Sequence, residues 1–198
     1  MDKRYLYAAG GVAALLGLLL VSRASADAGP TPVAKGGKIL LLGDSLAVGL
    51  TAELKKLAEA SGYAFASSAQ VGTRSDQWEA RIAPILTAEK PSLVLVSLGT
   101  NDAAMGPAAP QQDVHIGNVA ALLSSGPSLV WIAPPSLPAR LNDGPIRESI
   151  NRHAANVIDS RSMTFYRAPD GIHASPSGYA SWADQIWQVL LQWGVVTS

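Results

Sequence analysis

Short runs of apolar residues alternate with longer segments of helical periodicity over most of this chain. The run Ile39–Leu42 is followed by Leu46 and Leu50 at helical spacing, and Leu93–Val96 and Leu129–Ile132 lie between helical segments in the same way. Apolar runs without polar alternation are typical of parallel strands that are buried on both faces. The alternation therefore predicts one parallel sheet covered by helices on both sides.

The same patterns predict the remaining elements. Pro145 belongs at the first turn of a helix, and Ser175 with Pro176 has the composition of a helix start. The stretch 103–110 is rich in Ala, Gly and Pro, which favours a surface loop. We expect further strands at 63–67 and 163–166, a loop at 70–74, and helices at 75–86, 111–123, 145–160 and from 175 onward.

Composition limits the function. The chain has 198 residues, enough for one domain with a substantial core. Its formal net charge is zero and only 15% of its residues are charged, which argues against a nucleic-acid partner. Cysteine is absent, which excludes disulfides, thiol catalysis and cysteine-metal sites. No His or carboxylate cluster has the spacing of a metal site, so we expect no metal.

An apolar segment between basic residues marks the first 26 residues. Lys3 and Arg4 precede an uncharged, mostly apolar run over 5–22, and Arg23 ends it. Ala24-Ser25-Ala26 has the small-x-small form of a signal-peptide cleavage site. The run is also long enough to span a bilayer, which favours an uncleaved anchor. Either way we expect export, as a membrane-anchored protein facing the periplasm or the outside, or as a protein secreted after cleavage.

A Pro- and Gly-containing stretch over 27–37 follows, and its lack of periodicity predicts a flexible linker. The folded domain is expected over 38–198. We see no internal repeat.

Chemically capable residues follow the predicted strands. Ser45 lies where the first strand ends and a helix begins, Gly72 is in the loop after the second, and Asn101 follows the third. Asp170 and His173 come after the fifth. Each alone has an ordinary interpretation as a cap, turn or loop residue. Because the carboxyl ends of parallel strands share one edge, we expect these residues to meet in one crevice.

Together they supply what acyl transfer needs. Ser45 offers a hydroxyl, His173 an imidazole to accept its proton, and Asp170 a carboxylate to orient that imidazole. The backbone N–H groups of Ser45 and Gly72 and the side-chain amide of Asn101 can donate to the oxyanion of a tetrahedral intermediate.

These residues stand in four motifs: Gly43-Asp44-Ser45-Leu46, Gly72, Gly99-Thr100-Asn101-Asp102 and Asp170-Gly171-Ile172-His173. The set resembles the four signature blocks of the SGNH/GDSL hydrolase family, over about 39–193. The resemblance implies a flavodoxin-like three-layer α/β/α sandwich with a five-stranded parallel sheet. It also implies serine esterase or lipase chemistry without a metal or organic cofactor.

Carried over, the resemblance makes Ser45 the nucleophile, His173 the base and Asp170 its orienting partner, with Ser45, Gly72 and Asn101 as the oxyanion hole. The leading hypothesis is a serine esterase that removes short acyl groups, acetyl foremost, from a carbohydrate or small molecule through an acyl-enzyme. A lysophospholipase or acyl-thioesterase of the same family is the first alternative. A non-catalytic binding domain of the cell envelope is the second.

Other residues of the chain have structural interpretations beside functional ones. Arg74 and Trp78 follow Gly72 and are candidates for lining the substrate pocket, although ordinary loop packing is equally consistent with the sequence. His115 stands alone in a predicted helix and is expected at the surface. His153 falls on the apolar face of its predicted helix and is expected to be a hydrogen-bonded interior residue.

Asp44 and Asp102 are expected to hold loops by hydrogen bonds.

Overall fold

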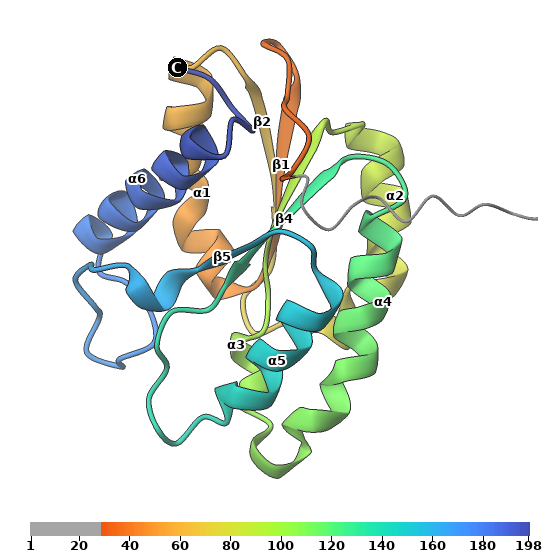
Figure 1. Cartoon of the computed structure of the whole chain (residues 1–198). Coiled ribbons are helices and arrows are strands. Elements are labelled where there is room, and N and C mark those ends of the chain that lie inside the picture. Colours follow the sequence, from red (N-terminus) through yellow and green to blue (C-terminus); the bar gives the residue numbers. More distant parts are fainter. Residues whose placement is uncertain (1–28) are drawn as a thin grey trace, which may run out of the picture.

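The computed structural model describes residues 29–198, which fold around a single parallel sheet (Figure 1). The five strands of this sheet lie in the order β2-β1-β3-β4-β5, and every neighbouring pair is parallel. The predicted three-layer α/β/α architecture is confirmed. The strands are β1 (Lys38–Gly43), β2 (Ala64–Ala69), β3 (Leu93–Ser97), β4 (Ser128–Ala133) and β5 (Val157–Asp159).

Helices cover both faces of the sheet, as Figure 1 shows. One face carries α1 (Ser45–Ala60) and α6 (Pro176–Gln192), which pack against each other. The other face carries α2 (Glu79–Glu89), α4 (Asp113–Leu123) and α5 (Asp143–His153). A short α3 (Thr100–Ala103) follows β3 directly. Three 3-10 turns complete the described part: 75–77, 106–112 and 160–162.

The apolar strands divide their side chains between two cores. In β1, Ile39 and Leu41 pack toward α1 and α6, whereas Leu40 and Leu42 pack toward α2 and α4. All four are at most 1% exposed. Since successive strand residues point to opposite faces, a strand covered on both sides must be apolar throughout. Burial of each such side chain contributes about 1.5–3 kcal/mol.

The order of the strands reverses direction at β1. The chain goes from β1 to its neighbour β2, and then to β3 on the other side of β1. The helices after β1 and β3 therefore leave toward opposite faces of the sheet. The point where they diverge is the usual place for a ligand in such sheets. Gly43 pairs with Ser97, so the residues after both strands begin at the same level.

The fifth strand and the helix before it differ from the sequence prediction. The helix expected over 145–160 ends at His153, and β5 is Val157–Asp159 rather than 163–166. The Asn156 carbonyl accepts the N–H of Trp131 at 2.8 Å, so pairing with β4 takes this stretch out of the helix. The stretch 103–110, expected as an open loop, contains the end of α3 and most of the 3-10 turn 106–112.

Part of the expected linker is packed on the domain. The N–H of Val33 donates to the carbonyl of Val195 at 2.8 Å, and Val33 is buried. The Lys35 ammonium donates to the Thr197 carbonyl at 2.9 Å. The prediction of a flexible linker is wrong for this part of 27–37, because the segment contacts the carboxyl-terminal residues.

The predicted signal peptide or anchor lies outside the described residues. No helix within residues 29–198 combines the length and the hydropathy that a bilayer-spanning segment needs.

Candidate active site

Three side chains from two distant parts of the chain form one hydrogen-bonded series. The Oγ of Ser45 lies 2.8 Å from Nε2 of His173, and Nδ1 of the same ring lies 2.6 Å from Oδ2 of Asp170. The structure thus brings together the predicted hydroxyl, imidazole and carboxylate. With Nδ1 donating to the carboxylate, Nε2 is left to accept the serine proton.

Ser45 has its position because a helix begins there. Asp44 is the N-cap of α1, and its Oδ1 accepts the N–H of Leu46 at 2.9 Å. Ser45 is the first residue of the helix, so its own N–H has no partner within the helix. The helix N-terminus also carries partial positive charge. An anion next to the Ser45 hydroxyl would therefore be stabilised.

The loop that carries His173 is shaped by Asp170. Oδ1 of Asp170 accepts the N–H groups of Ile172 and His173 at 2.8 and 3.0 Å, while Oδ2 binds the imidazole. These hydrogen bonds, that from His173 foremost, lower the pKa of Asp170 to about 2. The carboxylate is therefore ionised at neutral pH and can stabilise a positively charged His173 ring.

Two arginines that the sequence reasoning missed hold this loop in place. Arg167 donates to the Ile172 carbonyl at 2.9 Å and to the Ser136 carbonyl at 3.1 Å. Arg140 donates to the Asp170 carbonyl at 3.3 Å. These bonds connect the loop after β5 to the loop after β4. No sequence pattern marks either arginine, since their partners are backbone carbonyls, which any residue can supply.

Asn101, one of the predicted oxyanion donors, is hydrogen-bonded to two segments of the site. Nδ2 of Asn101 donates to the Thr73 carbonyl at 2.9 Å and lies 3.4 Å from Oδ2 of Asp44. Asn101 thereby connects the loop of Gly72 to the start of α1. Gly72 has φ +77°, a left-handed conformation that favours glycine. The second amide hydrogen of Asn101 is directed at Asp44, and the distance of 3.4 Å makes this a weak hydrogen bond.

Asp44 and Asp102 hold these loops together, as predicted. Asp102 accepts the N–H of Ser75 at 3.1 Å, which fixes the end of the Gly72 loop. Burial raises the pKa of Asp44 to about 7, and it also raises the pKa of Asp102. The negative charge of Asp102 raises the pKa of Asp44 further, and that of Asp76 raises the pKa of Asp102.

Of the two residues expected to line the pocket, Trp78 is wrongly assigned. Its side chain is 1% exposed in the core between the sheet and α2, and its Nε1 donates to Oγ1 of Thr73 at 3.0 Å. Trp78 thus supports the Gly72 loop from the interior of the domain. Arg74 is partly exposed and pairs with Asp76 at 2.9 Å, so its substrate role stays a prediction.

The other two histidines are paired away from Ser45. Nδ1 of His115 lies 2.6 Å from Glu79, in a partly exposed position. His153 ends α5, and its Nε2 lies 3.1 Å from Asp113. It is hydrogen-bonded, as expected, but only partly buried.

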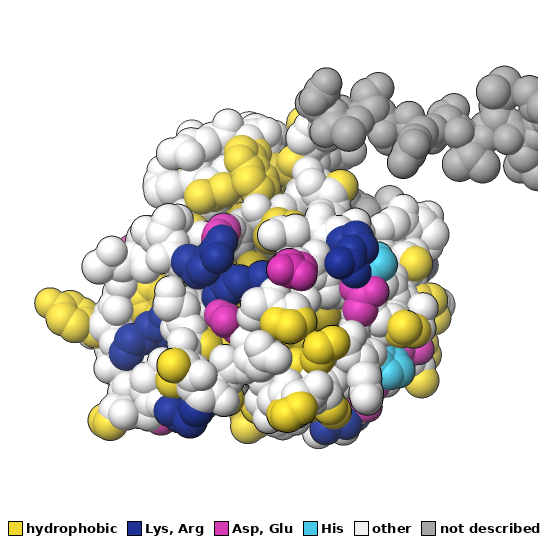
Figure 2. Space-filling view, turned by 60° about the horizontal axis from the view of Figure 1, so that its bottom comes forward, with side chains coloured by type: hydrophobic (Ala, Val, Ile, Leu, Met, Phe, Trp, Pro, Cys, Tyr) yellow, Lys and Arg dark blue, Asp and Glu magenta, His cyan; other side chains and the backbone are white. Residues whose placement is uncertain are grey.

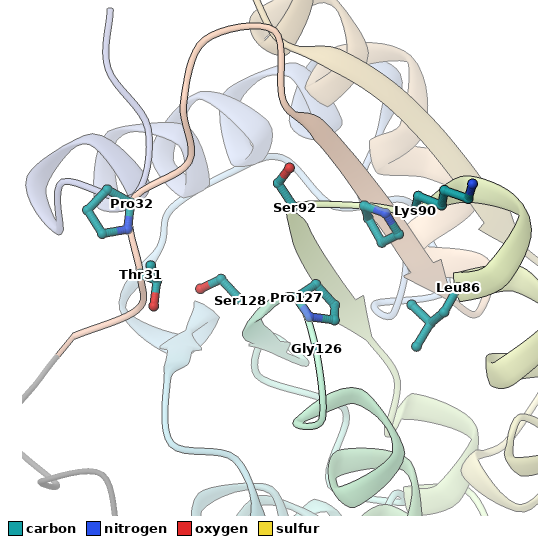
Figure 3. Close-up of a pocket in the computed structure, with 9 residues that line it drawn as sticks. Thr31, Pro32, Leu86, Lys90, Ser92, Gly126, Pro127 and Ser128 are labelled. Atoms are coloured by element: carbon teal, nitrogen blue, oxygen red, sulfur yellow. The ribbon is translucent and has the colours of Figure 1, made fainter.

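Charges of both signs are mixed at the carboxyl-terminal end of the sheet. Figure 2 shows Lys and Arg side chains lying next to Asp and Glu side chains on this side of the molecule. A cavity of about 440 Å³ lies at the opposite edge, where Thr31 and Pro32 approach Ser92 and Ser128 at the amino ends of β3 and β4 (Figure 3). The length of the sheet separates it from Ser45.

Comparison with known sequences gives one family match. The family model described as "Protein of unknown function (DUF459)" matches residues 38–138, which include Ser45, Gly72 and Asn101. Among curated proteins, none matches the chain.

Solved structures of esterases and lipases share the fold. A lipase/acylhydrolase from Enterococcus faecalis is 22% identical with a TM-score of 0.63, covering 78% of this chain and 95% of that one. A carbohydrate acetylesterase family member from Sinorhizobium meliloti is 18% identical (TM-score 0.60; 80% and 99% covered). An acetyl xylan esterase is 16% identical (TM-score 0.62; 77% and 99% covered). At these identities the likeness establishes the fold, and it confirms the fold expected of an SGNH/GDSL hydrolase.

Proposed function

The chain belongs to the family described as "Protein of unknown function (DUF459)", which is related to the SGNH hydrolases, and we propose that it is a serine esterase. One observation carries the proposal: the Ser45 hydroxyl, the His173 ring and the Asp170 carboxylate are joined by hydrogen bonds of 2.8 and 2.6 Å. The two ordinary interpretations, a helix cap for Ser45 and a solvated loop residue for His173, do not account for these hydrogen bonds.

In the proposed reaction, His173 Nε2 takes the proton from Ser45 Oγ as the oxygen attacks the ester carbonyl carbon. The carbonyl oxygen becomes an oxyanion, which accepts hydrogen bonds from the Ser45 and Gly72 N–H groups and the Asn101 amide. Collapse of this intermediate breaks the ester bond, and the leaving alkoxide takes the proton from His173. The acyl group remains on Ser45.

Deacylation repeats these steps with water. His173 takes a proton from the water as it attacks the acyl carbon, and the same donors stabilise the second oxyanion. Ser45 Oγ then leaves and regains its proton from His173. Asp170, ionised throughout, keeps the Nδ1 proton in place and stabilises the ring while it is positive.

We propose short acyl groups, acetyl in particular, on a carbohydrate or small molecule as the substrate. The described connections after β1 and β2 are short, and neither contains an apolar insertion of the kind that covers a fatty chain. Two of the proteins with this fold are described as an acetyl xylan esterase and a carbohydrate acetylesterase. A lysophospholipase or acyl-thioesterase is the alternative within the same chemistry.

A chain-length series tests both levels of the proposal. Purified 27–198 is assayed with p-nitrophenyl acetate, butyrate and octanoate, alongside Ser45→Ala and, as control, the exposed Ser177→Ala. We expect kcat/KM to be highest for acetate, to be lost in Ser45→Ala and to be kept in Ser177→Ala. Activity retained in Ser45→Ala would exclude Ser45 as nucleophile, whereas preference for octanoate would favour the alternative. Acetylated xylan and acetylated chitooligosaccharides then test the carbohydrate class.

We also propose that the protein is exported, with residues 1–26 as anchor or signal peptide. Intact-mass measurement of the full chain from membrane and soluble fractions tests this. A mass lacking the first 26 residues indicates cleavage, the full mass in the membrane fraction indicates an anchor, and the full mass in the cytosol alone contradicts export.

A further inference from the structure

A tyrosine on α6 fits closely against the helix of the nucleophile. Tyr179 lies in the first turn of α6, and its ring covers Gly49 of α1. A Cβ added at Gly49 would lie 2.0 Å from Cζ of Tyr179, the ring carbon that bears the hydroxyl. Gly49 is one helical turn after Ser45, so both face the same side of α1. The absence of a side chain at Gly49 therefore allows the Tyr179 ring to lie beneath the nucleophile.

The hydroxyl of Tyr179 is directed at the loop of the base. The N–H of Ala174, which directly follows His173, lies near this hydroxyl and favours its ionised form. Burial raises the pKa of Tyr179 to about 12, so the hydroxyl is neutral at physiological pH. The charges close enough to affect it are Asp44 on one side and Asp170 with Arg167 on the other. It thus lies between the start of α1 and the loop that carries His173.

Aromatic packing within the core holds the Tyr179 ring in place. Tyr179 is stacked on Trp182 with ring centroids 6.2 Å apart, and Trp182 is stacked on Phe165 at 5.0 Å. Nε1 of Trp182 donates to Oγ of Ser160 at 3.2 Å, which ties the stack to the segment after β5. A ring held in this way has little rotameric freedom, so its hydroxyl is a fixed point.

We propose that Tyr179 is a positioning residue that sets the separation of Ser45 and His173. Its ring fixes how closely α6 approaches α1 at Gly49. Ser45 begins α1 and His173 lies three residues before α6, so the spacing of the two helices also sets the spacing of these two residues. The inference rests on the proposed esterase function, because it assigns Tyr179 a role in aligning that reaction. Tyr179 does not itself exchange a proton with the substrate.

Removal of the hydroxyl alone is the first test. In Tyr179→Phe the ring still covers Gly49, so the fold should be kept, but the hydroxyl beside the Ala174 N–H is removed. With p-nitrophenyl acetate we expect kcat to fall roughly three- to tenfold, the effect of one neutral polar interaction, with KM unchanged. Tyr166→Phe is the matched control, because Tyr166 is 77% exposed and precedes the same loop. Equal kcat in Tyr179→Phe and wild type would overturn the proposal, as would a raised KM with unchanged kcat.

A double-mutant cycle is the second test. Gly49→Ala places a methyl group on the Tyr179 ring and should lower kcat about a hundredfold by displacing His173 from Ser45. In the Tyr179→Ala background the ring is gone, so Gly49→Ala should cause no further loss. Gly144→Ala, in open space in the first turn of α5, is the control. Independent, additive losses for Gly49→Ala and Tyr179→Ala would contradict the proposal.

The wild type separates this inference from the proposed function. If the wild type neither hydrolyses p-nitrophenyl acetate nor reacts with a fluorophosphonate at Ser45, the esterase proposal fails. If the wild type is active and Tyr179→Phe is equally active, only the role of Tyr179 fails.

Discussion

Nε2 of His173 lies 2.8 Å from Oγ of Ser45, although 128 residues separate them in sequence. Ser45 is fixed by the start of α1, and His173 by the hydrogen bonds of Asp170 within its own loop. Both arrangements are made by hydrogen bonds within the protein. The substitutions below test the residues that hold or surround the Ser45 hydroxyl and the His173 ring.

Asn101→Ala removes the side-chain donor of the proposed oxyanion hole. We expect kcat for p-nitrophenyl acetate to fall about 10²–10³-fold with a small change in KM, since the bond to the oxygen strengthens only as negative charge develops. The exposed Asn151→Ala on α5 is the control. A loss confined to KM would show that Asn101 only binds the ground state.

Asp170→Asn keeps the shape of the side chain but can present an N–H to Nδ1 of His173. The ring would then favour the tautomer with the proton on Nε2, and we expect kcat to fall at least about a hundredfold. Because the pKa of Asp170 is lowered to about 2, its ionisation should leave no feature in the wild-type kcat profile above pH 4. Asp184→Asn, an exposed change on α6, should leave kcat intact; an unaffected kcat in Asp170→Asn would refute its role.

Gly72→Ala tests whether the left-handed turn matters. An added Cβ meets no atom within 4 Å, so the cost comes from φ +77° alone. We expect the free energy of unfolding in urea to fall by about 1–2 kcal/mol. Gly72→Asn should cost less, because asparagine tolerates this region better. Gly126→Ala, also in open space but without positive φ, is the control, and equal losses in the Gly72 and Gly126 variants would argue against strain.

Asp44 should make stability depend on pH. Its pKa is about 7 in the fold and 3.8 in the reference state, so between these values the unfolded chain releases its proton first. Stability from this group is therefore present near pH 4 and declines as pH rises toward 7, by an amount on the order of a few kcal/mol. The unfolding free energy of the wild type minus that of Asp44→Asn should therefore become smaller or more negative as pH rises over that range. A difference independent of pH would contradict the raised pKa.

Much of the fold could be predicted because the strands are buried on both faces. Runs such as Ile39–Leu42 and Leu93–Val96 have no other stable place than a covered sheet. The site followed from the same reasoning, since a parallel sheet brings its carboxyl ends to one edge. Ser45, Asn101 and His173 were therefore accessible from sequence.

The fifth strand could not be predicted, for a physical reason. Ile146, Ile150, Ala154 and Val157 keep a helical spacing, and no Pro or Gly interrupts it. The helix ends at His153 because β4 offers backbone partners to 157–159, a tertiary interaction that local pattern does not contain. The stretch expected as a strand, 163–166, instead bonds to a side chain: Thr164 donates its N–H to Gln185 at 3.2 Å and accepts from it at 2.9 Å.

For Trp78 and Tyr179, the sequence did not reveal which way the side chain points. Trp78 follows the Gly72 loop but is buried, and its only polar atom, Nε1, donates a hydrogen bond to Thr73 inside the domain. Tyr179 belongs to the apolar stripe of α6, which gave no sign that its hydroxyl faces the loop of His173. In both cases the sequence placed the residue in the right segment, but its role depends on the direction of the side chain.

Covalent labelling tests the central claim, that Ser45 is a nucleophile activated by His173. Residues 27–198 are treated with a fluorophosphonate probe, and the modified peptide is identified by mass spectrometry. We predict stoichiometric labelling at Ser45 in the wild type, no labelling in Ser45→Ala, and a rate lower by orders of magnitude in His173→Ala. A wild-type protein that is folded yet unlabelled, or labelled equally fast without His173, would contradict the account.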